Sequence, residues 1–123
     1  MGPDDLKRRT KGFAIRIVRL FQSLPRTEEA RTLGKQLLRS GTSVAANYRA
    51  VCRSRSKAEF LARLGIVVEE IDETVFWLEL LTESSIVTPQ RLGELQREAN
   101  ELLAIFVTSQ LTAKGIHAKS GGL

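Results

Sequence analysis

Apolar residues recur along the chain with the spacing of a helix, and no stretch shows the alternation that is typical of a strand. The first helix is predicted over residues 5–24. Its apolar arc consists of Leu6, Phe13, Ile17, Leu20, Phe21 and Leu24, and its opposite arc of Arg8, Arg9, Lys11, Arg16 and Arg19. Pro25 ends this helix, because a proline disfavours helical backbone in the residue that precedes it.

A second helix is predicted from Thr27, a suitable N-cap residue, to about residue 53. Gly34 and Gly41 weaken it, since each glycine costs up to about 1 kcal/mol relative to alanine. A break near Gly41 is therefore the alternative. The apolar face continues across that point, which favours one unbroken helix; its members are Leu33, Leu37, Val44, Tyr48 and Val51.

Two further helices follow. The run Ser56-Lys57-Ala58-Glu59 has the pattern of a capping box and predicts a third helix to about residue 83. Thr88 and Pro89 are suited to an N-cap and a first helical position, and they begin a fourth helix. Its apolar stripe consists of Leu92, Leu95, Ala99, Leu102, Leu103 and Phe106. We therefore predict an all-α, up-down-up-down antiparallel four-helix bundle over residues 1–114, with a frayed tail over 115–123.

The second helix also carries a stripe of uncharged polar residues beside its apolar face. Its members are Gln36, Ser40, Ser43 and Asn47. One interpretation is a flank of the helix that is half exposed to water. The other is a tight contact with a second helix, in which short side chains allow close approach and Asn47 hydrogen-bonds across the contact.

The third helix has two apolar faces. The first consists of Phe60, Leu64, Val68, Ile71, Val75 and Leu78, and the second of Ile66, Glu70, Glu73, Trp77 and Leu81. A helix in a small bundle is usually half exposed, so a second face that bears a tryptophan predicts self-association. We expect a homo-oligomer, in which the polar stripe of the second helix and Ile66, Glu70, Glu73 and Trp77 serve the subunit interface or polar packing.

Glu70 and Glu73 are the candidates for metal ligands or for an acid–base pair. Metal sites in helix bundles combine glutamates with histidines, and the one histidine, His117, lies in the predicted tail. The chain also lacks a phosphate-binding loop and a nucleophile elbow. We therefore expect no catalytic residues, no metal and no cofactor.

Two expectations about packing follow from the same residues. A buried glutamate of this stripe is expected to pair with an arginine such as Arg49 or Arg53, or to accept a hydrogen bond from Asn47 or a hydroxyl. Cys52 lies on the apolar side of the second helix, and we expect it to be a small core residue.

The charge of the chain is strongly asymmetric. The net charge of +5 divides into fifteen basic and five acidic residues before residue 64, and four basic and nine acidic residues from there on. This asymmetry favours either a nucleic-acid surface or docking of the basic half onto the acidic half, and the simplest alternative is a solvated face. The candidate nucleic-acid-binding residues are Arg8, Lys11, Arg16, Arg19, Arg49, Arg53 and Arg55. No apolar run reaches the roughly 18 residues of a membrane span, so we expect a cytoplasmic protein that does not associate with membranes.

Several motifs resemble the bacterial four-helix bundle family of ribosomal RNA intervening-sequence proteins. The resemblance rests on the runs from Gly34 to Ser43, Ala46 to Arg49, Ser56 to Phe60, Glu69 to Thr74 and Trp77 to Leu81, and it covers roughly residues 10–113. Gln36, Ser43, Asn47, Glu70, Glu73 and Trp77 match the polar and aromatic signature of the family. Many members have a glutamate where Val51 or Cys52 stands here, which argues against chemistry at this corner.

The resemblance implies a homo-oligomer, commonly a ring of five subunits. It also implies a relation to the accessory protein of diversity-generating retroelements, which binds a reverse transcriptase and nucleic acid through a basic surface. From residues and resemblance together, we expect a non-enzymatic accessory or scaffold protein that associates with RNA or DNA. The alternative is a protein–protein interaction scaffold that binds no nucleic acid.

Overall fold

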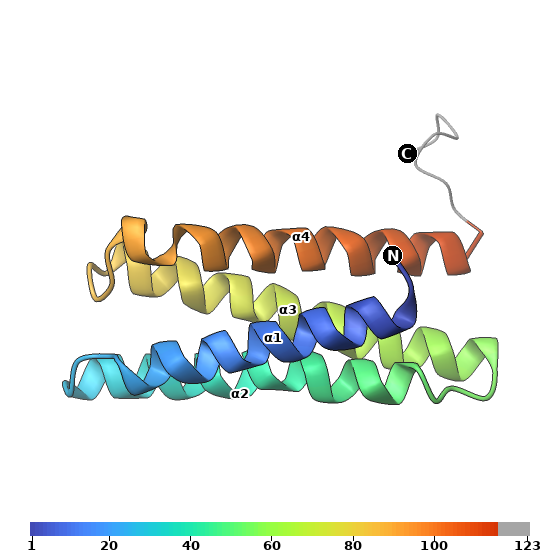
Figure 1. Ribbon diagram of the computed structural model, residues 1–123, viewed down its shortest axis with the longest axis horizontal. Helices are drawn as coiled ribbons and strands as arrows, with labels where there is room; N and C mark the ends of the chain where they lie inside the picture. Colours follow the sequence, from blue (N-terminus) through green and yellow to red (C-terminus); the bar gives the residue numbers. More distant parts are fainter. Residues whose placement is uncertain (116–123) are drawn as a thin grey trace.

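Four helices and no strand make up residues 1–115, which are the residues that the computed structural model describes. Helix α1 spans Pro3–Gln22, α2 spans Glu28–Val51, α3 spans Lys57–Glu83 and α4 spans Pro89–Ala113. Consecutive helices run antiparallel (Figure 1), so the predicted all-α four-helix bundle is confirmed. The predicted tail lies outside the described residues from residue 116 onward.

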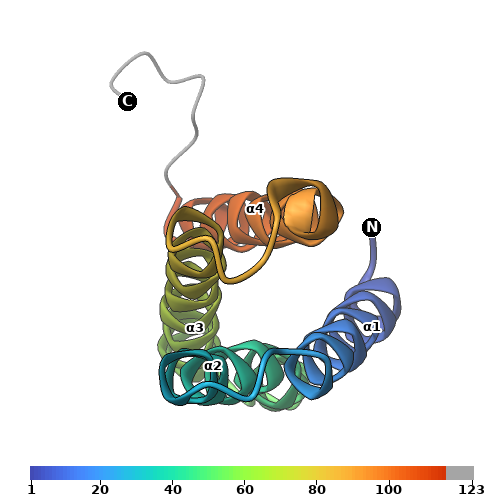
Figure 2. The same cartoon turned by 90° about the vertical axis from the view of Figure 1, so that its left-hand side faces the viewer.

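The helices follow one another around the bundle in chain order. Helix α2 packs against both α1 and α3, and α3 packs against α4. Viewed end-on, α1 and α4 stand further apart than the other neighbours (Figure 2), and they are the least closely associated adjacent pair. Tyr48 of α2 and Phe106 of α4 meet across the core, with their ring centroids 5.3 Å apart. Helix α4 is therefore held mainly by α3, and the contact of Phe106 with Tyr48 links it to α2 across the core.

The three predicted N-caps are confirmed. The hydroxyl oxygens of Thr27, Ser56 and Thr88 each accept a hydrogen bond from the backbone N–H three residues later, at 3.3, 3.0 and 3.3 Å. The reciprocal bond of the capping box differs from the prediction, because the Glu59 carboxylate accepts from the N–H of Arg55 at 3.1 Å. The start of α3 is as predicted, and only the donor of the reciprocal bond is shifted, from Ser56 to the residue before it.

Helix α2 passes through Gly34 and Gly41 without a break, as predicted. Both glycines lie where α1 approaches most closely. A Cβ atom at Gly41 would lie 2.8 Å from Cγ1 of the fully buried Ile17, and one at Gly34 would lie 2.5 Å from Cδ1 of Leu24. The weak helix formers in α2 are thus explained by the close packing of α1 on α2.

Two sequence-based expectations about single residues were wrong, and Asn47 makes no cross-helix hydrogen bond within the described residues of the protomer. Cys52 is exposed, because it follows the last residue of α2 at the point where the chain leaves the helix. Leu81 is fully buried in the core, so it does not belong to an outer stripe of α3. The Asn47 amide donates at 2.9 Å to the carbonyl of Ser43 in its own helix rather than across a helix contact.

Candidate nucleic-acid interface

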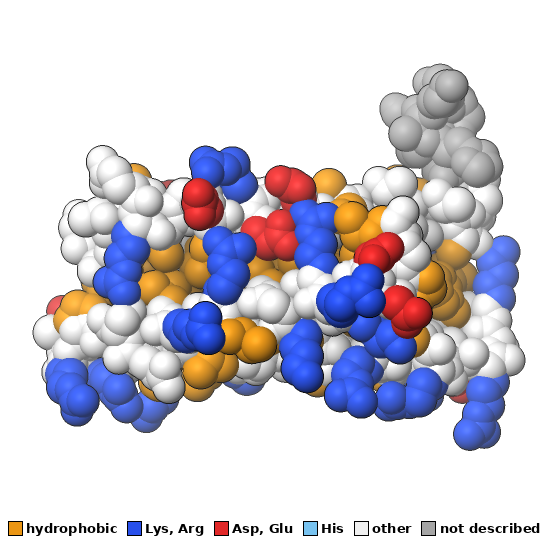
Figure 3. Space-filling view, in the orientation of Figure 1, with side chains coloured by type: hydrophobic (Ala, Val, Ile, Leu, Met, Phe, Trp, Pro, Cys, Tyr) orange, Lys and Arg blue, Asp and Glu red, His pale blue; other side chains and the backbone are white. Residues whose placement is uncertain are grey.

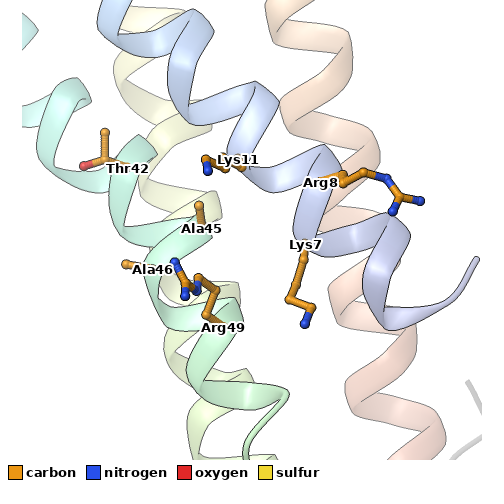
Figure 4. A pocket seen from close by; sticks show the side chains of 7 residues that line it. All are labelled: Lys7, Arg8, Lys11, Thr42, Ala45, Ala46 and Arg49. Atoms are coloured by element: carbon orange, nitrogen blue, oxygen red, sulfur yellow. The ribbon is translucent and has the colours of Figure 1, made fainter.

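A groove with a cationic rim lies between the first half of α1 and the second half of α2 (Figure 4). Its volume is about 520 Å³, and it is lined by Lys7, Arg8, Lys11, Thr42, Ala45, Ala46 and Arg49. Lys11 reaches from α1 toward α2, whereas Arg8 extends from the flank of α1 that faces away from α2. We call this feature the basic groove.

The local sequence explains the shape and sign of the basic groove. Lys7 and Lys11 are four residues apart in α1, and Ala45 and Arg49 are four apart in α2, so each pair lies on one face of its helix. The short side chains of Ala45 and Ala46 leave the floor open, and the long basic side chains rise around it. The result is an apolar floor with positive charge on both helices.

Most of the positive charge of the basic groove is available to a ligand. Lys7 pairs with Asp4 at 3.5 Å and Arg8 with Asp5 at 2.5 Å, and all four side chains are exposed. Such exposed pairs contribute little and exchange readily with other anions. Within residues 1–115, no carboxylate forms a salt bridge with Lys11 or Arg49.

The seven predicted basic residues do not form one surface. Arg8, Lys11 and Arg49 come together in the basic groove, while Arg16 and Arg19 line a second, smaller cavity between α1 and α4. The last two, Arg53 and Arg55, lie exposed in the connection from α2 to α3. In the view of Figure 3, basic side chains dominate the part of the surface formed by α1 and α2, and acidic ones gather along α4 and near the start of α1.

Sequence reasoning missed two basic residues of these cavities. Lys7 lies one helical turn before Lys11, and this spacing was a signal that could have found it. Arg91 of α4 lies beside Arg16 and Arg19 only because α4 packs next to α1. Nothing in the local sequence around Arg91 indicates that neighbourhood.

Arg39 joins the two glutamates of α3 to α2. Its guanidinium donates to both carboxylate oxygens of Glu70 at 3.3 Å and also to Glu73. The indole N–H of Trp77 donates to Glu73 at 3.0 Å. The hydrogen bond from Trp77, and then that from Arg39, lower the pKa of Glu73. An arginine pairs with these glutamates as expected, but it is Arg39 rather than Arg49 or Arg53, because the register of α2 on α3 brings Arg39 to this position.

The polar stripe of α2 serves different purposes along its length. Ser40 is fully buried, and its hydroxyl accepts a hydrogen bond from the hydroxyl of Thr74 at 3.0 Å. This bond joins α2 to α3 inside one protomer. Gln36 is exposed, and Ser43 and Asn47 are half-buried. Within one protomer, the tight-contact interpretation therefore applies to Ser40.

The outer side of α3 exposes large apolar side chains. Ile66 keeps 44% of its surface exposed and Phe76 keeps 51%. The rings of Phe76 and Trp77 meet edge to face, with their centroids 5.0 Å apart. Trp77 also packs against the core. We call Ile66, Phe76 and Trp77 the apolar patch of α3. Phe76 was not among the predicted interface residues.

Two other kinds of site are absent from residues 1–115. No group of three or more His, Cys, Asp or Glu side chains there is placed to hold a metal ion. No helix in that part of the chain combines the length and the apolar character needed to cross a lipid bilayer.

The fold and these surfaces define an all-α, four-helix protein with a basic groove between its first two helices. Residues 5–108 match the family of the 23S rRNA-intervening sequence protein, and the chain belongs to this family, which confirms the resemblance seen in the sequence. A crystal structure of a protein of unknown function from Bacteroides thetaiotaomicron, of the S23 ribosomal protein family, is similar, with a TM-score of 0.82 and 32% identity. The similarity covers 89% of this chain and 98% of that one. The search of curated proteins found no match.

Proposed function

We propose that this protein is a non-enzymatic accessory protein of the cytoplasm that binds RNA or DNA through the basic groove. The observation that carries the proposal is the gathering of Lys7, Arg8, Lys11 and Arg49 from two helices around one open groove. A nucleic acid that lies there exchanges its condensed counterions for these side chains, which favours binding at low salt. Among residues 1–115, no aromatic ring lines the groove, so its contacts go to phosphates rather than to bases.

The first test is a fluorescence anisotropy titration of a structured RNA and of a DNA duplex from low to physiological salt. The double variant Lys11→Glu with Arg49→Glu reverses the two groove charges that have no salt bridge within residues 1–115. We expect affinity to fall by at least a hundredfold at low salt, because two phosphate contacts become repulsive.

The matched control is Lys35→Glu with Arg97→Glu. Both residues are exposed and lie outside the basic groove, and the change in net charge is the same. An equal loss of affinity in the two double variants would show that only the overall charge matters. Absence of binding by the unaltered protein, even at low salt, would refute the proposed function.

The second part of the proposal concerns assembly. We propose that the protein forms a homo-oligomer through the apolar patch of α3. We also propose that this oligomer is the ring of five subunits that the family resemblance implies. The exposure of Ile66 and Phe76 supports this, since a lone protomer gains nothing from presenting such side chains to water. A ring would repeat the basic groove and increase affinity for a long nucleic acid.

The same apolar patch favours the alternative function, a scaffold that binds another protein. A reverse transcriptase is the kind of partner that the family resemblance implies. This alternative predicts normal assembly and partner binding in the Lys11→Glu, Arg49→Glu variant, together with no measurable nucleic-acid affinity in any variant.

A further inference from the structure

A second cationic cavity lies on the flank of α1 opposite to the basic groove. It occupies the junction between the end of α1 and the start of α4 and has a volume of about 250 Å³. It is lined by Arg16, Arg19, Leu20, Ser23, Arg91, Leu92 and Leu95. Three exposed arginines from two helices therefore line one small, open cavity.

The positive charge of this cavity is not balanced by nearby carboxylates. Within residues 1–115, none of Arg16, Arg19 and Arg91 forms a salt bridge. Two acidic residues of α4 do bridge these helices, but they contact α1 nearer its start. Glu98 and Glu101 pair there with Arg9, at 2.7 and 2.8 Å. Like charges that gather without a counter-charge repel one another, so an anion in the cavity would stabilise this junction.

Arg91 is held in position for such a contact. Its guanidinium donates to the hydroxyl oxygen of Ser23, and that hydroxyl donates its own proton to the carbonyl of Leu20 at 2.7 Å. Ser23 therefore orients Arg91 and leaves most of the guanidinium N–H groups free to donate elsewhere. Arg91 also lies in the first turn of α4, where the helix dipole adds positive potential.

We infer that Arg16, Arg19 and Arg91 form a binding pocket for a phosphate group. The guanidinium fork matches the geometry of phosphate oxygens and binds them in a bidentate manner. The volume lies below the roughly 300–1,000 Å³ usual for a whole small molecule, and no aromatic ring of the described part of the chain lines the cavity to stack on a base. The pocket therefore suits the phosphate group alone.

Two sources can supply that phosphate group. One is a free phosphate compound, and the other is the backbone of the nucleic acid proposed for the basic groove, so this second source rests on the proposed function. Lys11 and Arg19 are eight residues apart in α1, which corresponds to about 12 Å along the helix. A nucleic acid would therefore cross α1 obliquely, from the α2 side near its start to the α4 side near its end.

The first experiment measures inorganic phosphate binding at constant ionic strength, with chloride as the reference. The readout is the NMR signal of the arginine side-chain N–H groups in the full chain. We expect phosphate to shift the signals of Arg16, Arg19 and Arg91 together, and Arg91→Gln to weaken phosphate binding at least tenfold. The control is Arg97→Gln, because Arg97 is an exposed arginine of the same helix. It should change the affinity for phosphate less than twofold.

A second variant guards against an effect of Arg91→Gln on folding. Arg19→Gln leaves the contact between Arg91 and Ser23 in place and should also weaken phosphate binding about tenfold. Equal, small effects of all three substitutions would overturn the pocket, because they would indicate an unspecific ion atmosphere.

The second experiment identifies the source. If the phosphate belongs to a nucleic acid, Arg91→Gln should reduce the slope of log affinity against log salt for a DNA duplex by about one, and Arg97→Gln should not. An unchanged slope in Arg91→Gln, together with inorganic phosphate binding that the same substitution weakens, assigns the pocket to a free phosphate compound. If duplex binding is absent from the unaltered protein, the proposed function fails while the pocket is still decided by inorganic phosphate. If Arg91→Gln changes neither inorganic phosphate binding nor the salt slope, the pocket is overturned.

Discussion

At the scale of single residues, Glu73 has the most distinctive electrostatic environment among the carboxylates of the described chain. Trp77 and Arg39 both donate to its carboxylate and favour the ionised form, which lowers its pKa below the ordinary value of 4.5. A carboxylate with a lowered pKa in the folded state stabilises the fold fully above the unfolded-state pKa. That stabilisation is lost as pH falls through the lowered pKa.

The corresponding prediction concerns acid unfolding. Glu73→Gln should lower the melting temperature at pH 7 and make it less dependent on pH below about 5, because the variant has no carboxylate to protonate at this position. The measurement is thermal unfolding by circular dichroism between pH 7 and pH 3. Asp72→Asn is the control, since Asp72 is an exposed neighbour outside the Arg39 network. Identical pH dependence in Glu73→Gln and the unaltered protein would contradict this role of Glu73.

The residue scale also separates what the sequence could predict from what it could not. The caps Thr27, Ser56 and Thr88 were predictable, because a cap bonds to a residue three positions away. The contact between Arg91 and Ser23 joins residues 68 positions apart and depends on how α4 packs beside α1. No local pattern in the sequence encodes a contact between residues so far apart in the chain. The phosphate pocket of Arg16, Arg19 and Arg91 could therefore be found only in the folded chain.

At the scale of helices, the contact of α1 with α2 depends on the absence of side chains at two positions. Gly41 faces the fully buried Ile17, whose branched side chain has no room to move. The sequence marked Gly41 as a weak point of a continuous helix, and that continuity was predictable from the apolar face alone. The reason for a glycine at this position was not predictable, because that reason is Ile17 in the neighbouring helix α1.

Gly41→Ala tests this contact. Alanine should gain about 1 kcal/mol of helix propensity, and the clash with Ile17 should cost about 1–3 kcal/mol, so we expect a net loss of about 1 kcal/mol in the free energy of unfolding. The measurement is urea unfolding at equilibrium. Gly12→Ala is the matched control, because Gly12 lies inside α1 and a Cβ there would meet nothing within 4 Å. It should increase stability by about 1 kcal/mol. Stabilisation by both substitutions would show that α1 can move away from α2.

At the scale of the whole molecule, ion pairs between the basic and the acidic half account for only part of the charge asymmetry. Arg9 binds Glu98 and Glu101, and Arg39 binds Glu70 and Glu73, so part of the basic half does dock on the acidic half within one protomer. The two cationic cavities beside α1 lie outside these ion pairs. Charge counting along the sequence could give the asymmetry, but only the packing of the helices decides which cations have a carboxylate within reach.

The apolar patch of α3 carries the last prediction, on assembly. Substituting Ile66→Ser together with Phe76→Ser should reduce the native mass measured by sedimentation velocity, because exposed aromatic and aliphatic side chains dominate the energetics of such interfaces. Ile15→Ser is the matched control, since Ile15 of α1 keeps 43% of its surface exposed outside the patch. Because the substituted side chains are exposed, the helix content of each protomer should be unchanged. A native mass that is the same in all three proteins would exclude α3 as the subunit interface, and a monomeric unaltered protein would exclude the oligomer itself.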